Sequence, residues 1–467
     1  MILKNHWKRW GERLFYIGAM LLLILFFCAN VEKIAFDAFD YYTLSQSLKS
    51  GDGGFSLLNF PQTIRGVSGA IHFFVIGALA DFLHVDIRFI VVILNFFLLL
   101  GTVFLYVKIF DNSSEKKAKH CFLSAIGVVV LFAVFARYSV AALLMDLPSM
   151  CFIAIGAALL FLVFQNERHI WIFGCLSGIC LYSAYNMRSI YLFSIIIAVL
   201  IFLISIIAKK RYKLFAALLM CFAGILIAAV PQVIVNYHYY GVFSIKLYTA
   251  MNPADESLFV KQLFWGLDIC RYDTYVNSDG IFDVGRVAFK WPGAQNLMPL
   301  VTERSLKGYI VLMAKNPLYF LALYTSHFLN MLSPYFKQVY IMDLFAVKWP
   351  YLIAMFTVCY MTVWDILMKF QEKIYTFKSL TDKKFLLSLV LLFPALAIVP
   401  GAVEHRFGLP LFFLIFIYFV CICSFKKMWK KVKENPIGNL ALFGIVLMFM
   451  LNFWITTLSN GPIAIPI

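Results

Sequence analysis

The sequence predicts an all-α membrane protein that crosses the bilayer about eleven times and has further helices lying at the surface or re-entering it. Apolar residues make up 63% of the 467-residue chain and charged residues only 14%, whereas a soluble domain is roughly 45–50% apolar. Mean hydropathy is correspondingly high at +0.86. Most apolar residues fall in runs that approach or reach the roughly 17–25 residues of a membrane helix.

The basic residues are placed as a membrane topology requires. The net charge of +16 raises the question of nucleic-acid binding. However, the lysines and arginines form short clusters between apolar runs, which is typical of cytoplasmic loops. We therefore expect no nucleic-acid partner. The ten cysteines are scattered without a CxxC pair, so we expect neither a disulfide framework nor a zinc site.

The first apolar run, residues 16–31, follows four basic residues and is followed by Glu32 and Lys33 rather than a small-residue cleavage site. We expect a retained signal anchor with its N-terminus in the cytoplasm. Residues 33–87 then form one outer loop with membrane-lying helices. This loop includes the apolar run 67–83, because a crossing there would place the next lysine cluster outside.

The remaining topology follows from the other basic clusters, which favour the cytoplasm. If the run 318–332 crossed the membrane, the lysine clusters after it would fall on the outer side. We therefore expect this run to be re-entrant or interfacial. The predicted spans are 16–31, 89–110, 121–136, 147–164, 170–186, 190–208, 214–231, 349–368, 385–400, 409–424 and 437–456. The chain divides into a transmembrane module (1–235), an outer-face segment with interfacial or re-entrant helices (236–335) and C-terminal transmembrane helices (336–467).

Charged residues gather at the predicted outer helix ends. Asp37 and Asp40 follow the first span and are three apart, so in a helix they share a face, with Tyr41 one turn from Asp37. Capping of a short interfacial helix is the alternative reading of these acids. Carboxylates supply a base and arginines fork onto phosphate oxygens, which suits transfer from a lipid phosphate. The other outer residues are Arg65, Arg137, Asp146, Arg188, Glu404, His405 and Arg406.

Individual roles within this set remain open. Asp146 can orient the acceptor, hold a cation, or cap the helix that follows it. Arg65, Arg188 and Arg406 are candidate ligands for the donor phosphate, although interfacial arginines also snorkel without a ligand. We expect His405 to be an interfacial residue. Carboxylates could hold Mg²⁺ or Mn²⁺, but no His or Cys cluster supports a site, so no metal and no other cofactor is assigned.

Residues 37–48, D-A-F-D-Y-Y-T-L-S-Q-S-L, resemble the D-E-x-x-Y-x-x-(I/L)-A-x-x-L segment of GT-C class membrane glycosyltransferases. That class includes protein O-mannosyltransferases and lipid A aminoarabinose transferases. Asp37 falls on the catalytic aspartate of the class. Ala38 replaces the usual acidic neighbour, Ser45 replaces the usual alanine, and Asp40 is an additional acid.

Three further segments resemble motifs of the same class in the same order, so the resemblance covers roughly residues 10–424. They are the D-L-P segment at Asp146, Pro231 with Asn236 and Gly241, and Glu404 with Arg406 and Pro410. The resemblance implies a GT-C-like fold in which Tyr41, Asn236 and Glu404 are acceptor-site or structural residues.

The resemblance further implies inverting transfer of a sugar from a polyprenyl-phosphate donor to a glycan or lipid acceptor on the outer face. The residue types agree, because a phosphate leaves as a stabilised anion whereas the acceptor hydroxyl needs a base. An aspartate with an ordinary pKa of about 3.9 is ionised at neutral pH. Asp37 is the expected base and Asp40 its alternative. The donor, the acceptor and membrane lipids are the expected partners.

The outer residues 237–316 are expected to recognise the acceptor. Their aromatic rings can stack on sugar faces, although an interfacial aromatic belt explains most of them equally well. They are Tyr237, Tyr239, Tyr240, Trp265, Tyr272, Tyr275 and Trp291.

Other functions compete with this interpretation. A polysaccharide polymerase or ligase with a diphosphate-linked donor would use the same arginines. A transporter or flippase for a lipid-linked sugar would be expected to carry charges near the midplane and internal repeats, and a structural membrane protein would leave the one-sided charges unexplained. The richness in Phe, Ile and Lys favours a bacterial inner membrane, and O-antigen, teichoic acid or lipid A decoration follows from the resemblance alone.

Overall fold

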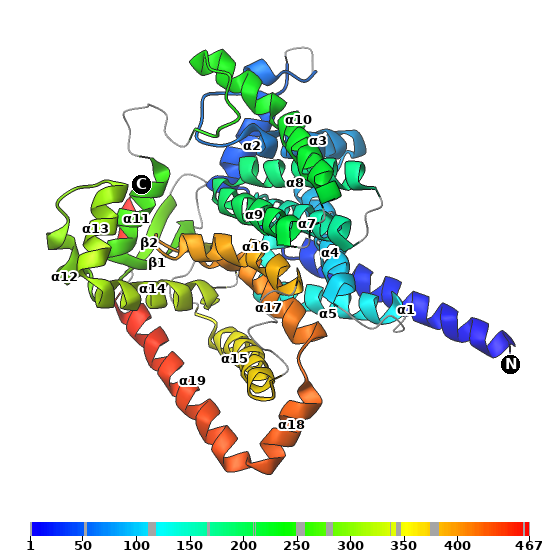
Figure 1. Cartoon of the computed structure of the whole chain (residues 1–467), viewed down its shortest axis with the longest axis vertical. Coiled ribbons are helices and arrows are strands. Elements are labelled where there is room, and N and C mark those ends of the chain that lie inside the picture. Colours follow the sequence, from blue (N-terminus) through cyan, green and yellow to red (C-terminus); the bar gives the residue numbers. More distant parts are fainter. Residues whose placement is uncertain are drawn as a thin grey trace.

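In a computed structural model the chain is mostly helical, with a helix bundle, a small sheet at its edge and a lower arm of three helices (Figure 1). The structure describes residues 2–50, 54–110, 118–165, 169–208, 210, 212–248, 257–276, 284–336, 338–341, 347–373, 383–460 and 463–466.

The N-terminal half builds the bundle. Its helices are α1 (Ile2–Cys28), α2 (Asp37–Ser47), α3 (Val67–Leu83), α4 (Ile87–Phe110), α5 (Ala118–Phe135), α6 (Arg137–Ala141), α7 (Asp146–Gln165), α8 (Ile170–Met187), α9 (Leu192–Ala208) and α10 (Phe215–Tyr240). Short 3₁₀ turns lie at η1 (Leu57–Asn59), η2 (Ser189–Tyr191) and η3 (Tyr212–Leu214). Helix α1 projects from the bundle at its N-terminal end (Figure 1).

The C-terminal half contributes the sheet and the lower arm. Its elements are α11 (Leu258–Asp268), β1 (Ile269–Val276), β2 (Val284–Lys290), α12 (Ala294–Leu297), η4 (Met298–Leu300), α13 (Leu306–Lys315), α14 (Pro317–Leu332), β3 (Tyr340–Ile341), α15 (Trp349–Gln371), α16 (Lys383–Ile398), η6 (His405–Gly408), α17 (Leu409–Cys421), α18 (Phe425–Glu434), α19 (Pro436–Ser459) and β4 (Ile463–Pro466). Helices α15, α18 and α19 form the arm (Figure 1).

The chain is a multi-pass membrane protein. Among the described residues seven helical segments are long and apolar enough to cross a bilayer, and an eighth is added if η6–α17 and α18, bent by 75°, form one span. The seven are 87–110, 146–163, 170–187, 189–207, 212–240, 349–371 and 436–459. The predicted spans 16–31, 121–136 and 385–400 correspond to shorter apolar helices. The run 67–83, predicted to lie in the outer loop, is also a shorter apolar helix. The total of eleven crossings stays a prediction.

Helices α8 and α10 pack through small residues. A Cβ atom at Gly178 would lie 1.8 Å from the carbonyl oxygen of Cys221, and one at Gly224 would lie 2.0 Å from that of Cys175. Only glycine permits this approach at both points. Because lipid tails are as apolar as the helices, such close van der Waals contact is what drives helices together in a membrane.

The fold is predominantly α-helical, as predicted, and it carries one small sheet made from strands within 236–335 and two later segments. Within the described residues its strand order is β3-β1-β2-β4, with β1 antiparallel to β2 and parallel to β3. The sequence concealed β1 because its buried positions include Arg271 and Asp273. These two side chains satisfy each other through two hydrogen bonds of 2.7 and 2.8 Å, so a polar segment becomes a core strand.

Two aromatic residues offered as sugar-stacking or interfacial groups belong to the core instead. Tyr272 and Trp291 are buried, and Trp291 packs in the hydrophobic cluster between the sheet, α11 and α14. Strand pairing brings their rings under the neighbouring helices, which spacing along the chain did not reveal. The side chain of Tyr275 lies outside the described part.

A buried ion pair holds the junction between α15, α17 and α18. Asp365 is fully buried and contacts Lys369 at 2.6 Å. Its two oxygens also accept hydrogen bonds from the Tyr418 hydroxyl (2.9 Å) and from the backbone N–H of Ser424 (3.0 Å). Because Ser424 immediately precedes α18, this carboxylate fixes where the chain turns by 75°.

Candidate active site

Seven charged residues from widely separated helix ends meet in one network, which we call the Asp37 cluster. Asp37 and Asp40 lie in the first turn of α2 and Arg65 lies just before α3. The cluster is Asp37, Asp40, Arg65, Asp146, Arg188, Glu404 and Arg406. The structure thus brings together every acid and arginine singled out from the sequence except Arg137.

Local backbone geometry aims Asp37 into the cluster. Phe36, the residue before α2, has a positive φ of 47°. This conformation is uncommon and costly for a bulky residue, and such residues persist where the surrounding structure holds them. Asp146 starts α7, Arg188 follows the last residue of α8, and Arg406 lies in η6.

Arg406 is the centre of the buried part of the cluster. Its Nη2 donates to Asp37 Oδ2 at 2.7 Å, and its Nε donates to Glu404 Oε2. Its Nη1 lies 3.8 Å from Asp146 Oδ2. Among the described residues, Arg406 Nη1 and Asp146 Oδ2 are buried without a hydrogen-bond partner. Each can therefore still form a hydrogen bond.

Arg65 forms the second half of the network. Its Nη2 donates to Asp37 Oδ1 at 2.6 Å and to Asp40 Oδ2 at 3.3 Å, while Nη1 donates to the Tyr41 hydroxyl at 3.1 Å. Tyr41 therefore orients an arginine. Arg188 donates from Nη2 to Asp146 Oδ1 and closes the chain of contacts.

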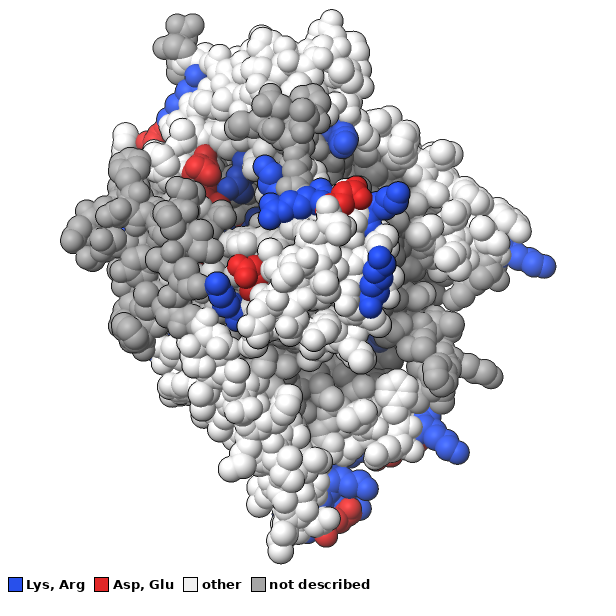
Figure 2. Space-filling view, turned by 90° about the vertical axis from the view of Figure 1, so that its left-hand side faces the viewer, with Lys and Arg blue, Asp and Glu red and all other residues white. Residues whose placement is uncertain are grey.

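Accessibility increases from Arg406 outwards. The side chain of Arg406 is 6% exposed and that of Asp37 10%, whereas Arg65 is 21% and Asp40 58% exposed. Asp40 and Arg65 are thus the members most able to meet a solute. Figure 2 shows acidic and basic side chains gathered around a recess in the upper half of one face of the molecule.

Electrostatics separate the two aspartates of α2. Burial alone would raise the pKa of Asp37, but Arg406, Arg65 and Arg188 outweigh it and hold that pKa well below the ordinary range. Burial raises the pKa of Asp40, and the nearby charge of Asp37 adds to the effect while Arg65 opposes it. Asp37 is therefore a firmly ionised partner of arginines, and Asp40 is the stronger proton acceptor.

The sheet supplies two contacts that the sequence did not indicate. Thr274 of β1 donates from Oγ1 to Glu404 Oε1 at 3.3 Å, and the Tyr340 hydroxyl of β3 accepts the backbone N–H of Ala38 at 3.0 Å. No local pattern could have identified them, because they reach the cluster only after β1 and β3 pair.

Other candidates lie apart from the cluster. Asn236 is buried. Its Oδ1 accepts a hydrogen bond from Gln232 Nε2 at 3.0 Å, and its Nδ2 donates to the carbonyl oxygens of Ser244 and Lys246. These contacts favour a structural role for Asn236 over a role in the acceptor site. Arg137 does not join the cluster, and its Nη1 donates a hydrogen bond to Asn30 Oδ1.

The prediction that His405 is interfacial is wrong. Its side chain is buried, and its Nδ1 lies 2.9 Å from the carbonyl oxygen of Met331 on α14. The 3₁₀ turn η6 directs His405 under α14 while Arg406 and Glu404 face the cluster, an arrangement that an ideal helix would not give.

Metal ligation is not favoured by the described residues. They contain no group of three or more His, Cys, Asp or Glu placed to hold an ion. The carboxylates of the Asp37 cluster face guanidinium groups instead of converging on a common point. The cluster therefore suits an anion held by arginines better than Mg²⁺ or Mn²⁺.

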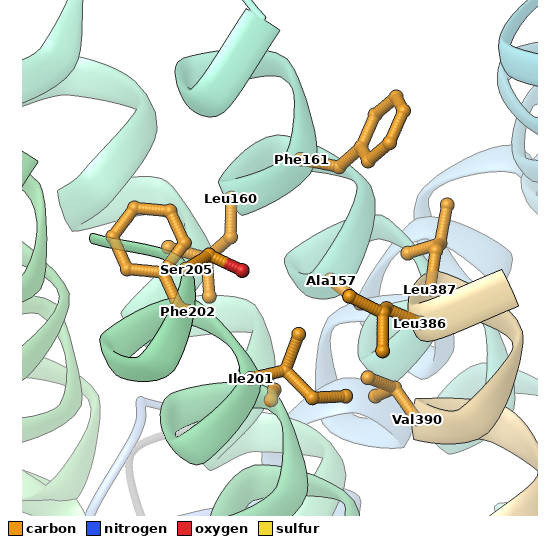
Figure 3. Close-up of a pocket in the computed structure, with 10 residues that line it drawn as sticks. Ala157, Leu160, Phe161, Ile201, Phe202, Ser205, Leu386, Leu387 and Val390 are labelled. Atoms are coloured by element: carbon orange, nitrogen blue, oxygen red, sulfur yellow. The ribbon is translucent and has the colours of Figure 1, made fainter. Parts of the chain in front are cut away.

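A second hollow lies within the membrane helices and is of another kind. It is a cavity of about 50 Å³ between α7, α9 and α16, and its lining side chains are apolar apart from Ser205 (Figure 3). It offers no group for proton or phosphoryl chemistry. The Asp37 cluster remains the candidate site.

The fold and the cluster together define a multi-pass, predominantly α-helical membrane protein with a partly buried acid–arginine centre at its helix ends. Comparison with protein-family models and with curated proteins finds no match to this chain.

Proposed function

We propose that this protein is an inverting glycosyltransferase that moves a sugar from a polyprenyl-phosphate donor to a cell-envelope glycan or lipid on the periplasmic face of a bacterial inner membrane. The observation that carries the proposal is the Asp37 cluster, in which arginines able to bind phosphate alternate with carboxylates able to accept a proton. The GT-C-like spacing of residues 37–48 supports it.

Arg65 is the arginine best placed to bind the donor phosphate. This guanidinium already spreads its donors over Asp37, Asp40 and Tyr41 and is the most exposed arginine of the cluster. A phosphate oxygen can replace a carboxylate on it, because guanidinium binds both in the same forked geometry. The displaced carboxylate is then free beside the reacting centre.

The reaction is a single displacement. The acceptor hydroxyl oxygen attacks the anomeric carbon, the bond from that carbon to the phosphate oxygen breaks, and polyprenyl phosphate leaves with the electron pair. The hydroxyl proton passes to a carboxylate. Asp40 fits this role by exposure and by its raised pKa, and Asp37, the base expected from the resemblance, holds Arg65 and Arg406 in place.

The test measures transfer of labelled sugar from a panel of polyprenyl-phosphate sugars to envelope glycans, in membranes carrying matched amounts of each variant. Asp81→Asn is the control, because Asp81 is a similarly exposed aspartate paired with Lys49. Loss of transfer in Asp40→Asn, with Asp81→Asn active, supports Asp40 as the base. Loss confined to Asp37→Asn moves the base to Asp37. Full transfer in both variants refutes the proposed site.

Sidedness is tested separately. Cysteine placed at position 40, which is exposed, should react with an impermeant maleimide only from the periplasmic side. Cysteine placed at Lys430 on α18 should react only from the cytoplasmic side. Labelling of position 40 from the cytoplasm would contradict the proposed location. Transport of a lipid-linked sugar without transfer would favour the flippase alternative.

A further inference from the structure

An open groove of about 570 Å³ lies at the C-terminal end of α10. None of the charged residues of the Asp37 cluster is among its described lining residues. Its lining comes from η1, from the last turns of α10 and from the segment that follows. Gly241 ends α10 with a φ of +64°, a conformation that glycine adopts without a steric penalty. The chain therefore turns back and brings Phe243 against Tyr237.

Tyr237 and Phe243 form a stacked aromatic platform in this groove. Their ring centroids are 4.4 Å apart and their planes differ by 25°. Tyr237 is 52% exposed and Phe243 is 77% exposed. Two large rings held against each other yet left open provide flat apolar faces with a polar tip on the tyrosine, which suits the apolar face of a sugar ring.

The groove continues a lipid-facing stripe of α10. The stripe consists of the exposed side chains Leu219, Phe222, Leu226, Ile227, Val230 and Ile234. From Phe215 to Ile234 an α-helix rises about 30 Å, which matches the hydrocarbon thickness of a bilayer. Tyr237 and Phe243 therefore lie at the level of lipid head groups, and a molecule in the groove can keep its tail along α10.

The groove's described lining contains one histidine, His238, and no Lys, Arg, Asp or Glu. An anionic phosphate head group has no partner there, whereas Arg65 and Arg188 offer one in the Asp37 cluster. The chemistry separates the two places: a charged phosphate suits the cluster and a neutral sugar suits the groove.

The groove and the cluster are built on connected segments. Leu58 lines the groove and Arg65 lies seven residues later, so the two places are at most about 25 Å apart along extended chain. The Tyr239 hydroxyl donates to the carbonyl oxygen of Phe60 at 2.7 Å, which fixes this connection to α10. Substrate parts bound in both places can therefore belong to one reaction.

We propose that this groove binds the neutral sugar head group of a membrane glycolipid, stacked on Tyr237 and Phe243, with its lipid tail along α10. The inference rests on the proposed function in one respect: the glycolipid would be the acceptor of the transferred sugar. Binding itself requires no catalysis, so it can be tested without the transfer reaction.

The experiment uses the full chain in phosphatidylcholine nanodiscs and saturation-transfer NMR with neutral methyl glycosides of glucose, galactose, mannose, rhamnose and N-acetylglucosamine. At least one glycoside should bind. Its affinity should fall by about 2- to 10-fold in Tyr237→Ala and in Phe243→Ala, the range that loss of an aromatic contact gives. Phe449→Ala, which removes an exposed ring from α19 and not from α10, should bind as the wild type does.

The outcomes separate the alternatives. Absence of binding by all five glycosides overturns the proposal, as does unchanged affinity in both groove variants. An equal loss in Phe449→Ala would indicate a general membrane effect and would also overturn it. If glycosides bind the groove while the wild type transfers no sugar, the groove stands and the proposed function fails. If sugar transfer depends on the cluster but no glycoside binds, the proposed function stands and the groove proposal fails.

Discussion

Replacing Arg406 with glutamine should be among the most destabilising single changes in this protein. The Arg406 side chain is 6% exposed and faces three carboxylates, Asp37, Glu404 and Asp146, whose side chains are all 10% exposed or less. Removing one partner of a buried ion pair costs about 3–5 kcal/mol, because the remaining charge stays desolvated. We expect the free energy of unfolding to fall by about that amount.

The assay is a denaturant titration of the purified protein in mixed micelles, followed by circular dichroism. Asp40→Asn is the matched comparison, since Asp40 is 58% exposed in its pair with Arg65 and exposed pairs contribute about 0–1 kcal/mol. Adding Glu404→Gln to Arg406→Gln removes one stranded carboxylate and should restore part of the lost stability. If Arg406→Gln matched Asp40→Asn, the argument from burial would be refuted.

Three further predictions concern pH, packing and the helix junction. Because the folded pKa of Asp37 is lowered, its stabilising contribution is present above about pH 4 and is lost as pH falls below it. Asp37→Asn should therefore flatten the fall in unfolding free energy measured between pH 5 and 2. The raised pKa of Asp40 has the opposite sign, so Asp40→Asn should not flatten it. Gly178→Ala should separate α8 from α10 and lower the unfolding midpoint, since its Cβ would lie 1.8 Å from a carbonyl oxygen. Asp365→Ala should cost about 3–5 kcal/mol in the same titration, by stranding buried Lys369.

Controls for the last two predictions lie in comparable positions. Gly101 in α4 has open space where a Cβ would be built, so Gly101→Ala should be harmless, and equal effects of the two glycine variants would contradict the packing argument. Lys427 pairs with Glu372 at the surface, and Lys427→Gln should change stability by about 0–1 kcal/mol. A loss for Asp365→Ala no larger than this would show that the junction does not depend on the ion pair.

Parts of the site could be anticipated because the signal was local. Asp37 and Asp40 share a helix face through their spacing of three, and the positive-inside rule sorted Arg65, Asp146 and Arg406 to one predicted side. Neither signal gives distances. The sequence did not show that Arg406 rather than Arg65 would be the buried centre, or that Asp40 would remain exposed while Asp37 was enclosed.

The membrane class and the positions of the long helices could be predicted from the apolar runs, because an apolar run of about 20 residues has few alternatives in a bilayer. The apolar runs did not indicate that Arg271 and Asp273 lie in a core strand, that His405 is buried, or that Thr274 and Tyr340 reach the cluster. Each depends on contacts between residues far apart in the chain. Such contacts decide which polar groups are satisfied in the interior, and no local pattern records them.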